Sequence, residues 1–239
     1  FILYYILIMT DSNIKFLNEH LPIFITHYTK LTDRKKFMMH QLNKHNIKAT
    51  FISDYDKEHL TDTDKSIFNQ NSLKIEEISL MCKHFYVYRH MIENDIKHAI
   101  ILEDDVLIYD NFIDNIVSYF KQLPPDWDFL FFGSGWNLHV PKSVMKDNLN
   151  VYLKGNNGIG QWSPEVKDIG WPICAGSSRC MDSYIINQKV IKKIFWHNKS
   201  TISKPLDLHF NIIFRHFNAN VYWGEPSLTK QDNFPSSLK

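Results

Sequence analysis

The stretch Ala99-Ile100-Ile101-Leu102-Glu103-Asp104-Asp105-Val106 runs from four apolar residues directly into three consecutive carboxylates. A short apolar run without interruption is typical of a strand buried on both faces, as in a parallel sheet. Ligands of open α/β sheets bind at the carboxyl ends of such strands. Two interpretations follow. The three acids form a cluster whose mutual repulsion a proton or a bound cation relieves, or they belong to a solvated loop that merely follows a core strand. Oxygen ligands favour Mg²⁺ or Mn²⁺ over zinc.

Apolar patterns on both sides of this strand alternate between the periods of strands and helices. The early part of the chain predicts strands over 22–25, 47–52 and 127–132, with helices near 32–42, 75–92 and 112–120 between them. This alternation indicates a parallel sheet with right-handed crossovers. A long segment over 136–172, containing three tryptophans, is predicted to be a lid or binding loop. A strand over 184–186, a helix over 187–195, a helix from 205 and a strand over 220–223 follow it.

Composition limits the class of protein. The 239 residues suit a single domain with a sizeable core, and a net charge of +1 without a basic stripe argues against a nucleic-acid partner. Three cysteines, Cys82, Cys174 and Cys180, predict reduced thiols rather than a disulfide framework. No stretch is long enough to span a membrane and no signal peptide is evident, so we expect a cytoplasmic protein. Residues 1–8, which precede Met9, are expected to lie outside the native fold.

Several motifs, in order, resemble glycosyltransferase family 25, which includes lipopolysaccharide galactosyltransferases and collagen hydroxylysine galactosyltransferases. The helical segment 77–84 is similar to the family signature Glu-Ile-Gly-Cys-x-x-Ser-His, although Ser79, Leu80 and Lys83 replace its glycine, cysteine and serine. The resemblance covers roughly residues 22–231. Its other motifs are Asp33-Arg34, Ile101-Leu102-Glu103-Asp104-Asp105, Asp128-Phe129-Leu130, Tyr184-Ile185-Ile186, Pro205-Leu206-Asp207 and the segment from Pro226 to Gln231.

The resemblance implies a GT-A fold, that is, a Rossmann-like and mostly parallel sheet flanked by helices, which binds a UDP-sugar and Mn²⁺ (or Mg²⁺). Glu103 and Asp105 would hold the ion between the two phosphates, with Asp105 the first choice as direct ligand. Asp104 or Glu103 would alternatively bind the ribose hydroxyls or act through water. Gln231 or Asp232 would supply a third ligand.

The nucleoside is expected over residues that follow the first two predicted strands. Thr26, His27 and Tyr28 follow the first strand, and Asp54 and Tyr55 follow the second. Either tyrosine would stack on uracil or simply pack against the surface. Arg34 either reaches the pyrophosphate or is an ordinary exposed charge in the first turn of a helix.

Transfer with inversion needs a general base for the acceptor hydroxyl. Asp207 is the candidate, because the first turn of a helix favours its ionised form, as it also would for an ordinary capping aspartate. Asp182 is the alternative base. His84 is predicted as a second catalytic residue, against the alternative of a satisfied histidine at the edge of the core.

These expectations combine into an inverting, metal-dependent transfer of galactose from UDP-galactose to hydroxylysine in a collagen-like protein. A saccharide acceptor of the lipopolysaccharide type is the first alternative, and a non-catalytic, degenerate transferase domain is the second. A metal-dependent phosphohydrolase is less favoured, because the sequence lacks a spaced set of ligands for a second metal.

Overall fold

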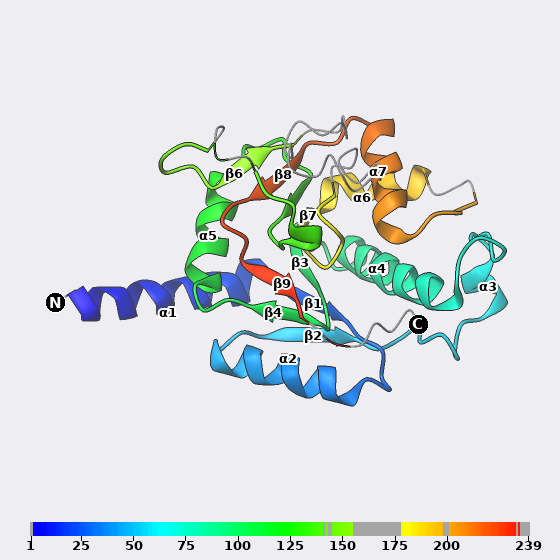
Figure 1. The fold of residues 1–239 in the computed structure, drawn as a ribbon, viewed down its shortest axis with the longest axis horizontal. Coiled ribbons are helices and arrows are strands. Elements are labelled where there is room, and N and C mark those ends of the chain that lie inside the picture. Colours follow the sequence, from blue (N-terminus) through cyan, green and yellow to red (C-terminus); the bar gives the residue numbers. More distant parts are fainter. Residues whose placement is uncertain are drawn as a thin grey trace.

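A seven-stranded sheet forms the centre of the molecule in the computed structural model, which describes residues 2–140, 142, 145–154, 178–197, 201–232 and 234 (Figure 1). Helices and strands alternate along the first half of the chain, as the sequence predicts. In chain order the elements are α1 (Ile2–His20), β1 (Ile23–Thr26), α2 (Thr32–Lys44), β2 (Ala49–Ile52), α3 (Asp62–Lys65), α4 (Ile75–Glu93), β3 (His98–Glu103), β4 (Val106–Ile108), α5 (Phe112–Gln122), β5 (Phe129–Phe131), the 3₁₀ turn η1 (Gly135–Asn137), β6 (Val151–Leu153), β7 (Ser183–Asn187), α6 (Gln188–His197), α7 (Leu206–His216), β8 (Val221–Gly224) and β9 (Thr229–Gln231).

The strand order in the main sheet is β2-β1-β3-β7-β5-β8-β6. Strands β2, β1 and β3 are parallel to one another, and β5 is parallel to β8. Strand β7 lies antiparallel between β3 and β5, and β6 is antiparallel to β8. The prediction of a mostly parallel α/β sheet is confirmed, but the strand predicted over 184–186 runs against its neighbours. Its amino end therefore lies at the edge where β3 ends, with Ser183 opposite Leu102.

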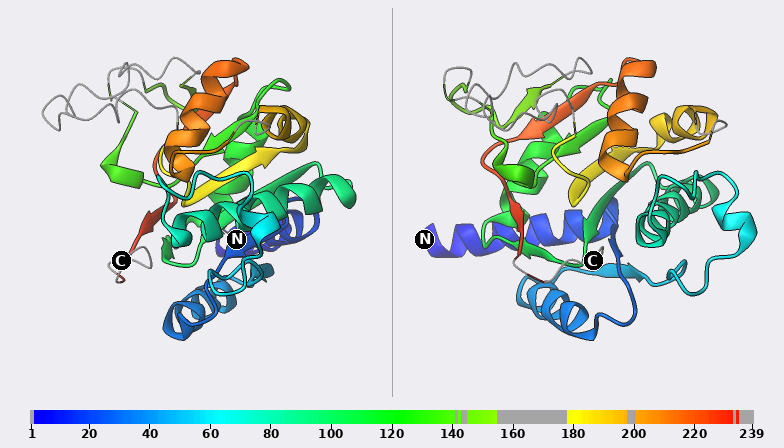
Figure 2. Two further views of the ribbon diagram at one scale, coloured as in Figure 1. Left: turned by 90° about the vertical axis from the view of Figure 1, so that its right-hand side faces the viewer. Right: turned by 45° about the vertical axis from the view of Figure 1, so that its right-hand side comes forward.

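Helices cover both faces of the sheet, so the core has two halves (Figure 2). Alternate side chains of strand β3 enter the two halves of the core. Ala99 and Ile101 face the half that contains α4, α6 and α7, whereas Ile100 and Leu102 face the half that contains α1, α2 and α5. All four side chains are fully buried. Burying one large aliphatic side chain is worth about 1.5–3 kcal/mol, which explains why an uninterrupted apolar run marks the central strand.

Some elements were not predicted. Strands β4 and β9 pair antiparallel in a separate two-stranded sheet, and β6 is a three-residue edge strand. Helix α1 was also not predicted, although Leu17, one of its residues, is fully buried in the core. Residues 2–8 begin this helix, but the side chains of residues 1–10 lie outside the described set, so the expectation that residues 1–8 are not part of the native fold stays a prediction.

The predicted loop over 136–172 is described only in part. Trp162, Trp171 and Cys174 lie outside the described residues, as does the side chain of Trp136. Cys82 and Cys180 are free thiols, as expected. Within the described residues, no helix is both long and apolar enough to cross a membrane.

Candidate functional site

A pocket opens where β1 and β3 end side by side, at the edge predicted from the acidic motif. Parallel pairing places Thr26 opposite Glu103, so the residues that follow each strand meet there. Eight of the residues predicted for the site line this pocket, together with six that were not predicted. The predicted ones are Thr26, His27, Tyr28, Arg34, Glu103, Asp104, Asp105 and Gln231, and the others are Leu31, Lys57, Glu76, Ser79, Leu80 and Lys83.

Arg34 and His27 fix the two aspartates of the acidic motif. The Arg34 guanidinium, from the first turn of α2, donates from Nη1 to Asp104 Oδ1 at 2.9 Å and to Asp105 Oδ2 at 3.0 Å. His27 Nδ1 lies 2.7 Å from Asp104 Oδ2. Both aspartates are buried, Asp104 with 5% and Asp105 with 7% of its surface exposed. Arg34 is thus a buried structural partner of the acids, rather than an exposed charge.

The carboxylates of the cluster are not balanced by these partners. Burial, followed by repulsion from Asp105 and Asp182, raises the pKa of Glu103 well above its usual value. Burial also raises the pKa of Asp105, although Arg34 opposes the shift. Asp182 lies one residue before β7 and comes to this edge because that strand is antiparallel. Its pKa is raised to about 6, chiefly by burial. A cation in the pocket would relieve this repulsion.

The donor set suits a hard divalent cation. Asp105 Oδ1 is buried and has no hydrogen-bond partner in the part of the chain that the structure describes, so one carboxylate oxygen remains for a ligand. Glu103 and Gln231 line the same pocket and offer further oxygen atoms. No group of three or more His, Cys, Asp or Glu side chains among the described residues is arranged to hold a metal. A bound ion would therefore need the Gln231 amide and ligands from a substrate.

Two loops, those that follow β1 and β2, and the start of α4 form another part of the pocket. Tyr28 Oη donates to Glu58 at 2.6 Å, and the Lys57 ammonium lies 5.6 Å from the centre of the Tyr28 ring. Lys57 also forms an ion pair of 2.7 Å with Glu76 at the start of α4. Sequence reasoning missed Lys57 and Glu76, because only the fold brings the β2 loop to the start of this helix.

Asp54 and Tyr55 are not brought to this pocket, contrary to expectation. Both line a neighbouring hollow with Tyr86 of α4, and the Tyr55 and Tyr86 rings lie 5.8 Å apart. The backbone explains the difference, since Tyr55 has a φ of 65° and the chain turns sharply there. Only Tyr28 of the two predicted stacking residues faces the pocket.

His84 is a core residue and does not line the pocket. Its side chain is fully buried, and Nδ1 lies 2.7 Å from the Tyr184 hydroxyl, which in turn lies 2.6 Å from that of Tyr88. Burial lowers the pKa of His84 to about 3, so its ring is neutral. His84 thus lies in the core, as the alternative to a catalytic role expected, although its Nε2 has no hydrogen-bond partner among the described residues.

Asp207 lies in the first turn of α7, as predicted, but also outside the pocket lining. Its carboxylate accepts a hydrogen bond of 2.8 Å from the amide of the next residue, Leu208. Burial raises the pKa of Asp207. Asp207 nevertheless lies near the other acids. The pKa of the Cys180 thiol is raised chiefly by burial and further by the charges of Asp182, Asp207 and Glu103.

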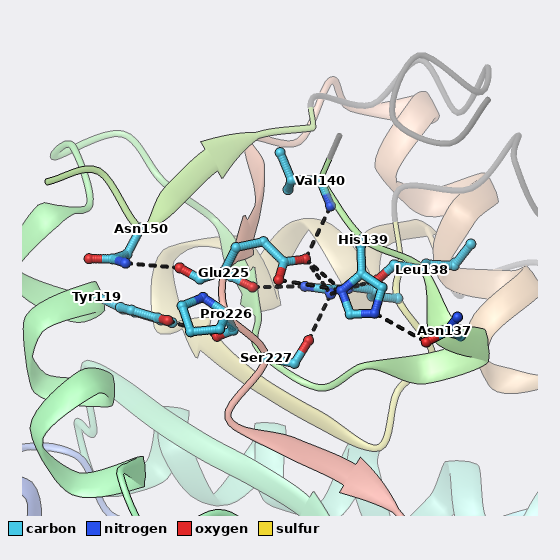
Figure 3. Close-up of polar contacts among 11 residues, drawn as sticks. Tyr119, Asn137, Leu138, His139, Val140, Asn150, Glu225, Pro226 and Ser227 are labelled. Carbon is cyan, nitrogen blue, oxygen red and sulfur yellow. Dashed lines mark hydrogen bonds and ion pairs between the residues drawn. The ribbon is translucent and has the colours of Figure 1, made fainter. Parts of the chain in front are cut away.

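A buried arginine fixes the strand that brings Gln231 to the pocket. Arg179 is fully buried and donates to the Gly224 carbonyl at 2.8 Å, to Glu225 at 2.6 Å and to Ser227 at 2.8 Å. Glu225 also accepts from the Val140 amide, and Tyr119 donates to the Pro226 carbonyl, so the segment between β8 and β9 is held on several sides (Figure 3). No sequence motif distinguishes Arg179 from a surface arginine.

Comparisons with known proteins give a matching family model and similar solved structures. A family model described as glycosyltransferase family 25 (LPS biosynthesis protein) matches residues 20–210. One similar solved structure is a glycosyltransferase involved in the glycosylation of the major capsid of PBCV-1, with 12% identity, a TM-score of 0.49 and coverage of 90% of this chain and 94% of that one. Another is A197 from STIV, with 16% identity, a TM-score of 0.46 and coverage of 91% and 86%. No curated protein matches the sequence significantly.

Proposed function

The chain belongs to glycosyltransferase family 25, and from this premise we propose that it transfers galactose from UDP-galactose to an acceptor hydroxyl, with inversion at the sugar carbon and with Mn²⁺ bound. Transfer of a glycosyl group follows from the family. The observation that supports the proposed metal is the buried pair Asp104 and Asp105 at the carboxyl end of β3, held by Arg34 and His27.

Asp105 and Glu103 would hold the ion, with Gln231 as the third protein ligand. Asp105 is the first ligand because its Oδ1 has no hydrogen-bond partner among the described residues, whereas Arg34 holds its Oδ2. Mg²⁺ is an alternative, since both ions prefer oxygen. When bound, the ion offsets the negative charge that develops on the departing diphosphate.

Arg34 and His27 orient the carboxylates, and the remainder of the pocket would take the nucleoside. Arg34 contacts both aspartates, and His27 fixes the second oxygen of Asp104, so Asp104 is fully engaged. Asp104 is therefore better suited to hold its neighbours in place than to bind metal directly. Tyr28 offers a ring face at the other end of the pocket, where a uracil ring would stack.

We retain Asp207 as the general base. It would take the proton of the acceptor hydroxyl as the oxygen forms a bond to the sugar carbon and the bond from that carbon to the UDP oxygen breaks. Asp207→Asn should reduce kcat by about 10²–10⁴-fold while changing the Kd for UDP by less than about twofold. Asp182→Asn is the matched comparison. Loss of transfer in Asp182→Asn alone would move the role to Asp182.

The acceptor belongs to one of two classes. The description of the matching family model as an LPS biosynthesis protein favours a saccharide hydroxyl. The hydroxylysine of a collagen-like protein is the other acceptor, predicted from the resemblance alone. Both present a hydroxyl to the same base, so only measurement of transfer separates them.

Release of UDP from a panel of UDP-sugars, with Mn²⁺ or with a chelator, tests the proposal. Release from UDP-galactose that needs Mn²⁺ and rises with a saccharide acceptor is the expected result, and release that rises with a hydroxylysine peptide would select the other acceptor. Asp105→Ala should abolish the release that depends on Mn²⁺. Asp110→Ala, at an exposed aspartate paired with Lys44, is the matched control and should leave release unchanged. No release from any donor would favour a non-catalytic domain.

A further inference from the structure

Two side chains on one face of α4 hold the loop that follows β2. Ser79 Oγ donates to the Tyr55 carbonyl at 2.6 Å, and Lys83 Nζ donates to the Asp54 carbonyl at 2.5 Å. Residues four apart lie on the same face of a helix, so the two side chains reach two consecutive carbonyls. Both side chains are buried, with 6% of Ser79 and 3% of Lys83 exposed.

The loop needs such support because of its backbone. Tyr55 has a φ of 65°, in the left-handed region that costs a residue with a side chain free energy. A conformation of this kind persists where the surroundings fix it. The two hydrogen bonds from α4 fix the carbonyl of Tyr55 and the carbonyl immediately before it.

Lys83 also connects this loop to the loop that follows β1. Its ammonium forms an ion pair of 2.7 Å with Asp56 Oδ1, while Asp56 Oδ2 accepts a hydrogen bond of 3.1 Å from the Thr29 amide and another from the Thr29 hydroxyl. Burial alone would raise the pKa of Asp56, but the hydrogen bonds from Lys83 and Thr29 outweigh it and leave the pKa below its usual value. Asp56 and Lys83 are thus a matched, charged pair.

These contacts form a wall of the pocket. Ser79 and Lys83 line it together with Leu80, and the loops that they hold contribute Tyr28 and Lys57. Metal and diphosphate belong beside the acids of β3, so this wall would face the nucleoside half of a donor.

We propose that Ser79 and Lys83 are positioning residues, which fix the β1 and β2 loops as the wall of the nucleoside-binding half of the pocket and so set the affinity for the nucleoside diphosphate. The proposal rests on the proposed function, since it assumes a nucleotide-sugar donor. Neither residue takes part in bond breaking. Their loss should therefore raise the KM for the donor and leave kcat unchanged.

The test uses calorimetric titration of the full chain with UDP and Mn²⁺, followed by transfer kinetics. Lys83→Met keeps the length of the side chain and removes the charge, and should raise the Kd for UDP and the donor KM by about tenfold or more, with kcat within about twofold. Ser79→Ala should raise both by about threefold to tenfold, and Ser79→Thr, which keeps the hydroxyl, should restore them. Lys97→Met, at an exposed ion pair with Asp95, is the control and should change neither.

The outcomes distinguish this inference from the proposed function. A wild-type chain that binds no nucleoside diphosphate overturns both. If Lys83→Met and Ser79→Ala fold and bind UDP with the same Kd as the wild type, the inference alone is overturned. A fall in kcat with unchanged KM would likewise overturn it, by giving these residues a chemical role. If Lys83→Met does not fold, the comparison of Ser79→Ala with Ser79→Thr decides.

Discussion

Replacing Arg34 with alanine tests whether one buried arginine holds the acidic cluster together. The substitution removes two hydrogen bonds, 2.9 and 3.0 Å long, together with the guanidinium charge that lies between Asp104 and Asp105. At pH 7.5 in a chelator, Asp104 would keep its contact with His27, whereas Asp105 would lose its ion-pair partner. We expect the folded state to lose free energy relative to the wild type.

The magnitude follows from the burial of the three side chains, none of which is more than 10% exposed. Removing one partner from a buried ion pair costs about 3–5 kcal/mol. For a chain of this length such a loss lowers Tm by about 10 °C. The loss should be smaller at pH 4.5 than at pH 7.5, because burial raises the pKa of Asp105 and so favours its neutral form as the pH falls. Added Mn²⁺ should stabilise Arg34→Ala more than it stabilises the wild type.

Urea unfolding followed by circular dichroism, at both pH values, measures this difference. Arg89→Ala is the matched control, because the Arg89 guanidinium is exposed and donates one hydrogen bond of 3.1 Å to the Tyr55 hydroxyl. The control should lose less than about 1 kcal/mol. If Arg34→Ala loses no more than Arg89→Ala at pH 7.5, the argument that Arg34 neutralises the buried acids is wrong.

Three further predictions concern stability. Burial raises the pKa of Asp182 to about 6, so the folded state binds this proton more tightly than the unfolded state, and the free energy of unfolding falls as the pH rises from about 4 through 6. In urea unfolding, Asp182→Asn should therefore be more stable than the wild type by up to about 3 kcal/mol at pH 8, but not at pH 3. Gln41→Met should cost about 2–4 kcal/mol, because the Gln41 amide bonds the Val106 carbonyl and the Ile108 amide, and hydrogen exchange should locate the loss in β4. Gly135→Ala should lower Tm in calorimetry, since its Cβ would lie 2.1 Å from the Arg179 carbonyl oxygen.

The sequence predicted the elements that bury whole faces and missed those that depend on distant partners. The run from Ala99 to Leu102 determines β3 by itself, because each of its side chains enters one half of the core. Strand β4 has only three residues, and its backbone groups are satisfied by β9, more than a hundred residues away, and by the Gln41 side chain. No local pattern contains that information. The direction of β7 was likewise not readable from an apolar run.

The same division applies to the site. The predicted residues at the ends of β1 and β3 line one pocket, because parallel strands bring their carboxyl ends together. Asp54 and Tyr55 were expected by the same rule, but the left-handed turn at Tyr55 directs both side chains to a neighbouring hollow. His84 matched a motif, yet it lies in the core. Lys83 and Arg179 gain their roles from carbonyls and carboxylates that only the folded chain assembles.

Burial argues against one of the two interpretations of the acidic motif, the solvated loop. A solvated loop would leave its carboxylates exposed, whereas Asp104 and Asp105 are almost completely buried. A structural cluster would also be balanced, as Asp56 is by Lys83, and the pKa of Asp56 is accordingly lowered. Among the acids at this edge of the sheet the shifts are opposite: burial raises the pKa values of Glu103, Asp105 and Asp182, and their partners do not offset it. A cation bound at the end of this central strand would relieve that cost, and the proposed reaction requires such a cation.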